Sequence, residues 1–169
     1  VEPAAADRPP PPGAMHWWHG YGVHAGSGYV CNGVVVAMAA TAMSDFVQRP
    51  VSTLSGGEKA RALLARVLAG EPRWILADEP LAALDLAHQL SLLKVLRAEA
   101  DKGAGVVLVL HDVNFASCYS DYIVAMKDAR IAYQGSPADI IQPDVMRCVY
   151  DIDIAVHDIE GRRIAVYYT

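Results

Sequence analysis

Residues 54–85 read LSGGEKARALLARVLAGEPRWILADEPLAALD, and this stretch decides the predicted fold. Ser55 followed three residues later by Glu58 is the spacing of a capping box, in which two side chains close the start of a helix. Apolar residues then repeat at helical spacing until Gly70 stops the pattern. The stretch therefore predicts a helix over about 56–69.

A short apolar run at 74–77 follows this helix and predicts a strand buried on both faces, as in parallel sheets. Asp85 is placed to cap a second helix, and residues 106–110 form a second apolar run. A strand, a helix of about seventeen residues and another strand make a right-handed crossover, so the two strands run parallel. Their carboxyl ends are expected to share one edge of the sheet.

Outside this unit, the pattern predicts further helices and two hairpins. Together with the crossover they give an α/β fold with parallel core strands, a helix after the Ser-Gly-Gly turn and a C-terminal β-hairpin. The expected elements are helices at 34–46, 113–119 and near Pro137 and Pro143, strands at 122–126 and 130–134, and a hairpin of 152–157 and 163–168 turning at Glu160 and Gly161.

Composition excludes several classes of protein. Hydrophobic residues make up 53% of the 169 residues and charged residues 20%, which rules out wholesale disorder. No apolar run approaches the roughly 18–20 residues of a membrane-spanning helix. A net charge of −5 is the wrong sign for binding a polyanion, so nucleic acid is not expected as a partner. Three widely spaced cysteines fit a reducing cytosolic setting better than a disulfide framework.

Residues 1–33 differ in composition from the rest of the chain. They hold five of the ten prolines and six of the thirteen glycines, so we expect a disordered or non-homologous segment, followed by one domain over 34–169. A metal site in this segment is the less favoured alternative, because no ordered scaffold is predicted around its ligands, which would be His16, His19, His24 and Cys31.

Three places in the sequence can carry chemistry, and the first is the predicted helix start at 55–57. Unpaired backbone amides and the helix dipole attract anions there, and Gly56 and Gly57 carry no Cβ that would keep a phosphate away. A plain capped helix is the alternative interpretation of Ser-Gly-Gly alone.

The other two places follow the predicted strands. Asp78 suits an oxygen ligand of Mg²⁺, and Glu79 suits the acceptor of a proton from attacking water. An exposed turn is the alternative for this acidic pair. His111 comes one residue after the second strand, where an imidazole can bind a terminal phosphate or have a structural role. We expect all three places to face one phosphate chain.

These residues resemble, in order and spacing, the ATP-binding subunits of ABC transporters. The resemblance runs from about residue 34 to the C-terminus and implies a P-loop NTPase fold that binds ATP and Mg²⁺. It also implies a role for each motif. Asp78 would be the Walker B magnesium ligand, Glu79 the catalytic base, Asp85 the D-loop aspartate and His111 the switch histidine, and the signature motif, which grips ATP held by an opposite subunit, would be Leu54, Ser55, Gly56, Gly57 and Glu58.

The amino-acid sequences of several segments are similar to those of the branch of this family that imports iron-siderophores, haem and cobalamin. This implies an ATP-hydrolysing subunit on the cytoplasmic face of the membrane. Its partners would be a second ATP-binding subunit, membrane permease subunits and, indirectly, a substrate-binding protein. No Gly-Lys dipeptide occurs in the chain, so the phosphate-binding P-loop (Walker A) of this family is absent from it. We therefore expect the C-terminal part of such a domain, with doubtful activity on its own.

Two alternatives stay open at this point. The first is a non-hydrolytic module that only binds a partner or regulates it. The second is an ABC ATPase of DNA repair or translation, against which the acidic charge and the lack of a basic arm stand.

Overall fold

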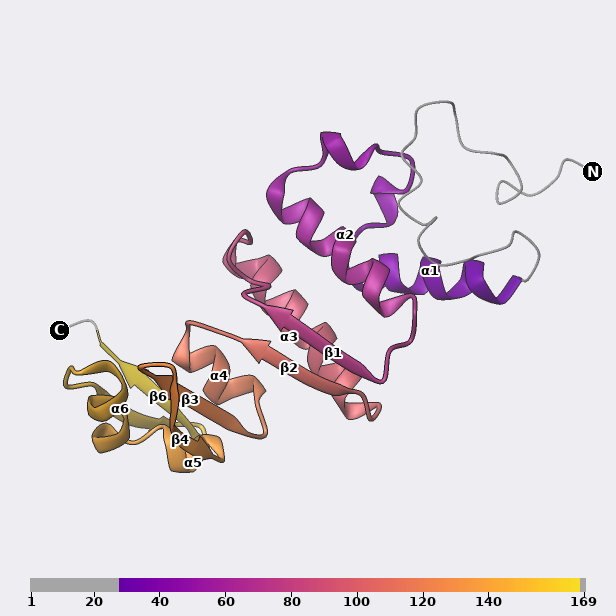
Figure 1. Cartoon of the computed structure of the whole chain (residues 1–169). Coiled ribbons are helices and arrows are strands. Elements are labelled where there is room, and N and C mark those ends of the chain that lie inside the picture. The colour runs from indigo at the N-terminus through magenta and orange to yellow at the C-terminus, as the bar shows by residue number, and fades with distance from the viewer. Residues whose placement is uncertain (1–27, 168–169) are drawn as a thin grey trace, which may run out of the picture. The chain divides into compact units, whose positions relative to one another are not determined.

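A computed structural model describes residues 28–167, which divide into two compact units at the Val107–Leu108 bond. The predicted segment 1–33 and its metal-ligand alternative thus lie mainly outside the described residues, and the boundary at residue 33 stays a prediction. The first unit holds α1 (Gly28–Ala40), η2 (Ser44–Phe46), η3 (Val51–Thr53), α2 (Gly56–Leu68), β1 (Trp74–Asp78) and α3 (Leu86–Asp101), and β2 (Gly105–Val109) crosses the division (Figure 1).

Helix α2 begins where the sequence predicts. Ser55 is its N-cap, the Ser55 hydroxyl accepts a hydrogen bond from the Glu58 amide at 3.3 Å, and the Ser55 amide donates to the Glu58 carboxylate at 2.7 Å. Both halves of the capping box are therefore present.

Helix α1 differs from the helix expected over 34–46. It ends at Ala40 in a Schellman motif, in which Met43 N–H bonds to Met38 C=O at 2.7 Å and Ala42 N–H bonds to Ala39 C=O at 3.1 Å. Ala42 has a left-handed backbone (φ 53°), a position that usually holds glycine, so the sequence gives no stop signal there. The following residues form the 3₁₀ turn η2.

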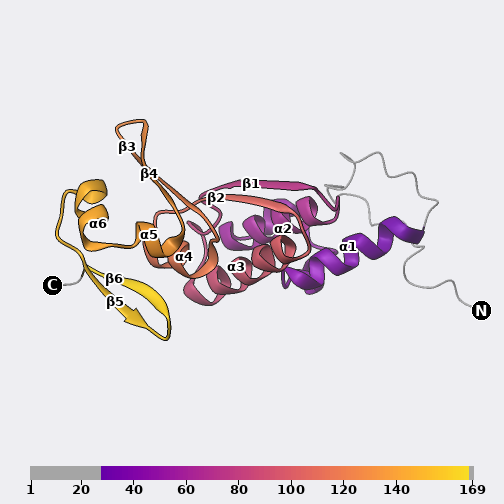
Figure 2. The same ribbon diagram turned by 90° about the horizontal axis from the view of Figure 1, so that it is seen from below.

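Strands β1 and β2 pair with each other and point the same way (Figure 1), with α3 between them in the chain. The parallel crossover is therefore confirmed. The helices of the first unit lie on one side of the two strands (Figure 2). They enclose a core whose buried side chains are Ala37, Met38, Met43, Leu54, Ala62, Ala65, Leu68, Ile75, Leu81, Leu84, Leu92, Leu93 and Leu96.

The expectation that the first strand is buried on both faces is wrong. Ile75 is buried, but Trp74 is 66% exposed and Leu76 78% exposed. The physical reason is that burial of a strand depends on what packs against it. Among the described residues, the sheet has two strands and helices on one face only.

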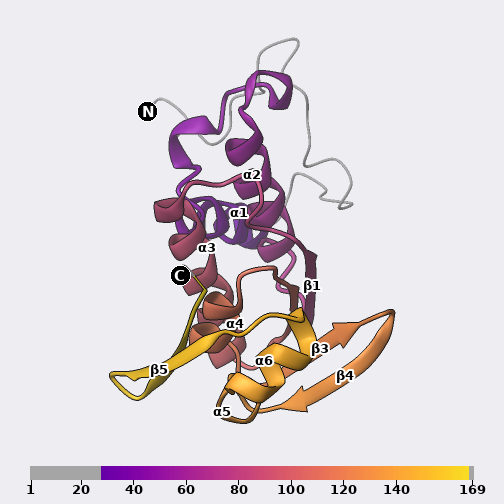
Figure 3. The same ribbon diagram turned by 90° about the vertical axis from the view of Figure 1, so that its left-hand side faces the viewer.

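The second unit contains two hairpins and three helices at almost the predicted bounds. They are α4 (Val113–Tyr119), β3 (Ile123–Lys127), β4 (Arg130–Gly135), α5 (Pro137–Ile140), α6 (Pro143–Tyr150), β5 (Ala155–Ile159) and β6 (Arg162–Val166), with α6 beside the β3–β4 ribbon (Figure 3). Its core contains Ile140, Ile141, Met146, Ile154 and Ala165.

Both hairpins close through two-residue turns whose backbone is left-handed at both positions. These turns are Asp128–Ala129 (φ 50° and 57°) and Glu160–Gly161 (φ 54° and 76°). Such turns match the twist of antiparallel strands and set the register next to each turn, although the β3–β4 register shifts between Ala125 and Met126.

Helix α4 is fastened to β6 by side-chain hydrogen bonds to the strand's backbone. Asn114 accepts from Ala165 N–H at 2.8 Å and donates to Ala165 C=O at 3.1 Å, and Ser117 donates to Arg163 C=O at 2.6 Å. These bonds satisfy backbone groups on the edge of a two-stranded sheet that has no further strand partner among residues 28–167.

Within residues 28–167, no helix is long and apolar enough to cross a bilayer.

Candidate nucleotide site

The N-terminus of α2 offers two backbone donors to a ligand. The Ser55 and Glu58 amides are occupied within the capping box. Within the described part of the chain, the amides of Gly56 and Gly57 donate no hydrogen bond. These donors lie at the positive end of a thirteen-residue helix, which is an arrangement that binds phosphate.

The two glycines differ in how much room their surroundings leave for a side chain. A Cβ on Gly57 would lie 3.1 Å from the Ala83 carbonyl oxygen and 3.2 Å from Leu84 Cδ2, so the loop 79–85 approaches too closely for a side chain. A Cβ on Gly56 would meet only Ala83 Cβ, at an ordinary 3.8 Å. Neither glycine has a positive φ. The packing of the described chain thus explains the glycine at 57 but not the one at 56.

Glu58 and Leu54 hold this turn in place, and their predicted contact with a nucleotide stays a prediction. The Glu58 carboxylate holds the Ser55 amide, and its other oxygen lies 3.8 Å from the Arg49 guanidinium. The hydrogen bond from the Ser55 backbone is the main reason that the pKa of Glu58 lies below its ordinary value, with the Ser55 hydroxyl, Arg49 and Arg61 lowering it further. Leu54 is buried and anchors the turn to the core.

Arg61 joins this helix to the end of α1, a role that the sequence does not signal. Its guanidinium donates to the carbonyl of Ala42 at 3.0 Å and to that of Thr41 at 3.5 Å, the acceptors that the end of α1 leaves exposed. Its Cζ also lies 6.0 Å from the centre of the Phe46 ring, and Arg49 Cζ lies 5.3 Å from the same ring centre. The turn before α2 is therefore held by contacts at several points.

The acidic pair lies where β1 ends. Asp78 is the last residue of the strand, and both Asp78 and Glu79 are exposed. Glu79 has a left-handed backbone (φ 45°) although it is not glycine and precedes Pro80, a combination that costs about 1–3 kcal/mol. Such strain persists only where the surrounding structure enforces it.

The loop that follows enforces this conformation. Leu81 and Leu84 are buried, and the Gln89 side chain donates to the carbonyls of both, at 3.2 and 3.0 Å. Gln89 was not among the predicted site residues. Its place in the first turn of α3, four residues after the N-cap, is the only signal that the sequence offers.

Asp85 is the N-cap of α3, as predicted. Its carboxylate accepts from the His88 amide at 2.9 Å and lies 2.8 Å from His88 Nδ1. The His88 amide is the main cause that lowers the pKa of Asp85 below its ordinary value. The carboxylate therefore fixes the junction between the loop and the helix.

His111 is exposed and lies between the end of β2 and Asp112, the N-cap of α4. Asp112 accepts from the amides of Asn114 and Phe115 at 2.8 and 2.9 Å, so the residue after His111 is fixed in place. His111 belongs to the second unit, whereas the acidic pair belongs to the first. That His111 and the acidic pair face one phosphate chain stays a prediction.

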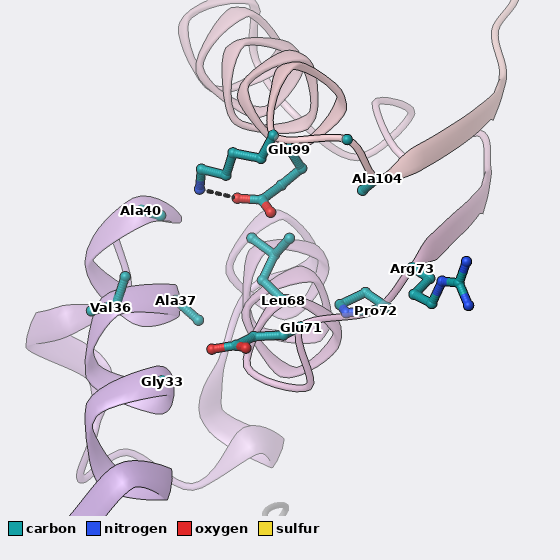
Figure 4. A pocket seen from close by; sticks show the side chains of 12 residues that line it. Gly33, Val36, Ala37, Ala40, Leu68, Glu71, Pro72, Arg73, Glu99 and Ala104 are labelled. Atoms are coloured by element: carbon teal, nitrogen blue, oxygen red, sulfur yellow. Dashed lines mark hydrogen bonds and ion pairs between the residues drawn. The ribbon is translucent and has the colours of Figure 1, made fainter.

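A separate groove of about 670 Å³ lies between α1 and the C-terminal ends of α2 and α3 (Figure 4). Gly33, Ala37 and Leu68 form part of its wall, and the ion pair of Glu99 with Lys102, at 2.7 Å, lies on another side. None of the predicted site residues lines it.

Known proteins resemble this chain in sequence and in fold. The ABC transporter family matches residues 30–82, which include the capped glycine turn and the acidic pair. The petrobactin import ATP-binding protein YclP of Bacillus subtilis is 39% identical over 134 residues, covering 79% of this chain and 53% of that protein. Residues 30–82 therefore carry part of an ABC transporter domain.

Two further comparisons agree with this family. The hemin import ATP-binding protein HmuV of Rhodococcus jostii is 42% identical over 123 residues, or 72% of this chain and 42% of that protein. The fold matches that of a metal-chelate type ABC transporter solved in an inward-facing conformation, with a TM-score of 0.71 at 21% identity, over 85% of this chain and 59% of that one. The chain spans about half the length of the curated relatives that it matches.

Proposed function

We propose that this chain supplies the signature-motif and Walker B part of an ATP-hydrolysing subunit of an importer. The observation that carries the proposal is the pair of glycines in the capped turn, of which the fold explains only one. A position at a helix N-terminus that stays bare without a packing reason is suited to close approach by a phosphate.

The residues present fit ATP and Mg²⁺. A Cβ on Gly56 would make only one ordinary contact, so the backbone there is accessible to a phosphate, and Asp78 offers an exposed carboxylate at the end of a strand. Mg²⁺ prefers such oxygen ligands, and when bound it would neutralise the developing charge on the phosphate. Asp78 would hold the ion, and Gly56 and Gly57 would donate to phosphate oxygens.

Glu79 is proposed as the group that accepts a proton from the attacking water. Its left-handed backbone and the loop held by Leu81, Leu84 and Gln89 fix where its side chain starts, which favours one orientation of the carboxylate. His111 is proposed to donate to the terminal phosphate. Ser55, Glu58 and Asp85 would act by keeping the two helix starts in place.

The transported compound is proposed to be a metal chelate such as an iron-siderophore, haem or cobalamin. The relatives named for petrobactin and hemin import support this class. In this proposal the chain works with a second ATP-binding subunit and membrane permease subunits, is served indirectly by a substrate-binding protein, and lies on the cytoplasmic face of the membrane. Nucleic acid is not proposed as a partner.

The test is ATP turnover by the chain together with a polypeptide that supplies a P-loop. Replacing Glu79 by Gln keeps the size of the side chain and removes the proton acceptor. We expect turnover to fall about 10²–10⁴-fold while nucleotide binding is kept. Unchanged turnover would show that Glu79 takes no part in hydrolysis, which is what the partner-binding alternative expects of this chain.

A further inference from the structure

A small cavity lies between helices α2 and α3, next to the end of α1, within the first unit. Leu64 and Leu92 form apolar parts of its wall, and Arg61, His88 and Ser91 bring polar groups to it. About 10 Å³ of the cavity admits the centre of a water molecule. A sphere of that volume is about 2.7 Å across, and hydrogen-bonded oxygens lie about 2.8 Å apart, so the cavity has room for one water and not for two.

Arg61 carries a buried donor that needs a partner. Its Nη1 donates to the carbonyls of Thr41 and Ala42. Its Nε is buried and makes no hydrogen bond within the part of the chain that the structure describes. A buried N–H group without a partner costs free energy, and a water that bonds to further polar groups removes that cost.

His88 offers an acceptor on the facing helix. Its Nδ1 lies 2.8 Å from Asp85 Oδ1, at hydrogen-bond distance. An ionised carboxylate can only accept, so in the neutral ring Nδ1 carries the proton and Nε2 keeps its lone pair. Because the His88 side chain also lines the cavity, Nε2 is the acceptor that it can offer to a ligand there.

We propose that this cavity binds one water molecule, which accepts from Arg61 Nε–H and donates to His88 Nε2 and to the Ser91 hydroxyl. Three partners are the usual number for such a water. The hydrogen bonds then run without a break from Arg61 through the water and His88 to Asp85. They tie α2, the helix that starts at the Ser-Gly-Gly turn, to the residue that caps α3.

Nuclear magnetic resonance of the full chain at pH 8, without nucleotide, tests for this water. The Arg61 Nε–H signal, assigned by its loss in Arg61→Lys, should show a nuclear Overhauser effect to bound water, opposite in sign to that from bulk water. The ¹⁵N signals of His88 should show a protonated Nδ1 and a hydrogen-bonded Nε2. Arg61→Lys removes Nε and keeps the positive charge, and it should shift the Nε2 signal.

Two variants of His88 separate the water link from the helix cap. The side-chain amide of Asn reaches about as far as Nδ1 and that of Gln about as far as Nε2, and both variants keep the backbone amide that Asp85 accepts from. His88→Asn should therefore lose the effect between Arg61 Nε–H and bound water, and His88→Gln should keep it. His157→Asn is the matched control, because His157 is exposed on β5 in the other unit, and it should change nothing.

Three results would overturn the inference. The first is an Arg61 Nε–H signal in the wild-type chain that shows no effect to bound water or is lost through rapid exchange with solvent. The second is a His88 ring that carries its proton on Nε2. The third is an effect that persists in His88→Asn, in a variant whose circular dichroism spectrum matches that of the wild-type chain.

Discussion

The clearest stability prediction comes from the two neighbouring glycines of α2. Both have helical backbones, so alanine at either position reduces the conformational freedom of the unfolded chain and stabilises by about 0.4–1 kcal/mol. At Gly57, the new Cβ would lie 3.1 Å from a backbone oxygen and 3.2 Å from Leu84, so the loop must shift by a few tenths of an ångström. Such overpacking costs about 1–3 kcal/mol.

We therefore expect Gly56→Ala to raise the melting temperature by a few degrees and Gly57→Ala to lower it. A net difference of about 2 kcal/mol between the variants corresponds to about 4–8 °C for a chain of this size. Thermal melts of both variants followed by circular dichroism measure it. If Gly57→Ala proved as stable as Gly56→Ala, the close approach of Ala83 to the helix would be refuted.

Three further predictions follow from the caps and the missing loop. Asp85→Ala should lower the melting temperature by a few degrees, and Asp85→Asn, an equally good cap, should restore it. Because the pKa values of Glu58 and Asp85 are lowered in the folded chain, their stabilisation is complete above the ordinary carboxyl pKa. It should be lost as pH falls through the lowered values, so melts between pH 7 and 3 should show a decline that the double variant Glu58→Gln, Asp85→Asn flattens. The chain alone should bind Mg-ATP weakly or not at all, and micromolar affinity by calorimetric titration would contradict this.

Local signals made much of the fold predictable. Helix α2 could be placed because the capping pair of Ser55 and Glu58 lies within four residues, and the hairpin turn at Glu160–Gly161 was equally local. The end of α1 could not be placed, because Ala42 adopts a conformation for which its residue type gives no signal.

Features that depend on tertiary packing could not be predicted from the sequence pattern. The apolar run of β1 gave no indication that Leu76 would face solvent, since burial depends on the neighbours of the sheet. The contact between Ala83 and Gly57 joins residues 26 positions apart. It shows that close packing excludes a side chain at Gly57 but not at Gly56, a difference that the Ser-Gly-Gly motif does not indicate. Asp85 was predicted as both a cap and a D-loop residue, and the structure shows the cap.

We propose that Asp78 would hold Mg²⁺ and that His111 faces the same phosphate chain. Mn²⁺ in place of Mg²⁺ tests it, because this paramagnetic ion broadens the proton resonances of nearby groups. In a complex with ATP and a polypeptide that supplies a P-loop, the His111 imidazole signal, assigned with His111→Gln, should broaden, and Asp78→Asn should abolish the effect. A sharp His111 signal, while other resonances broaden in an Asp78-dependent way, would show that His111 lies away from the ion that Asp78 holds.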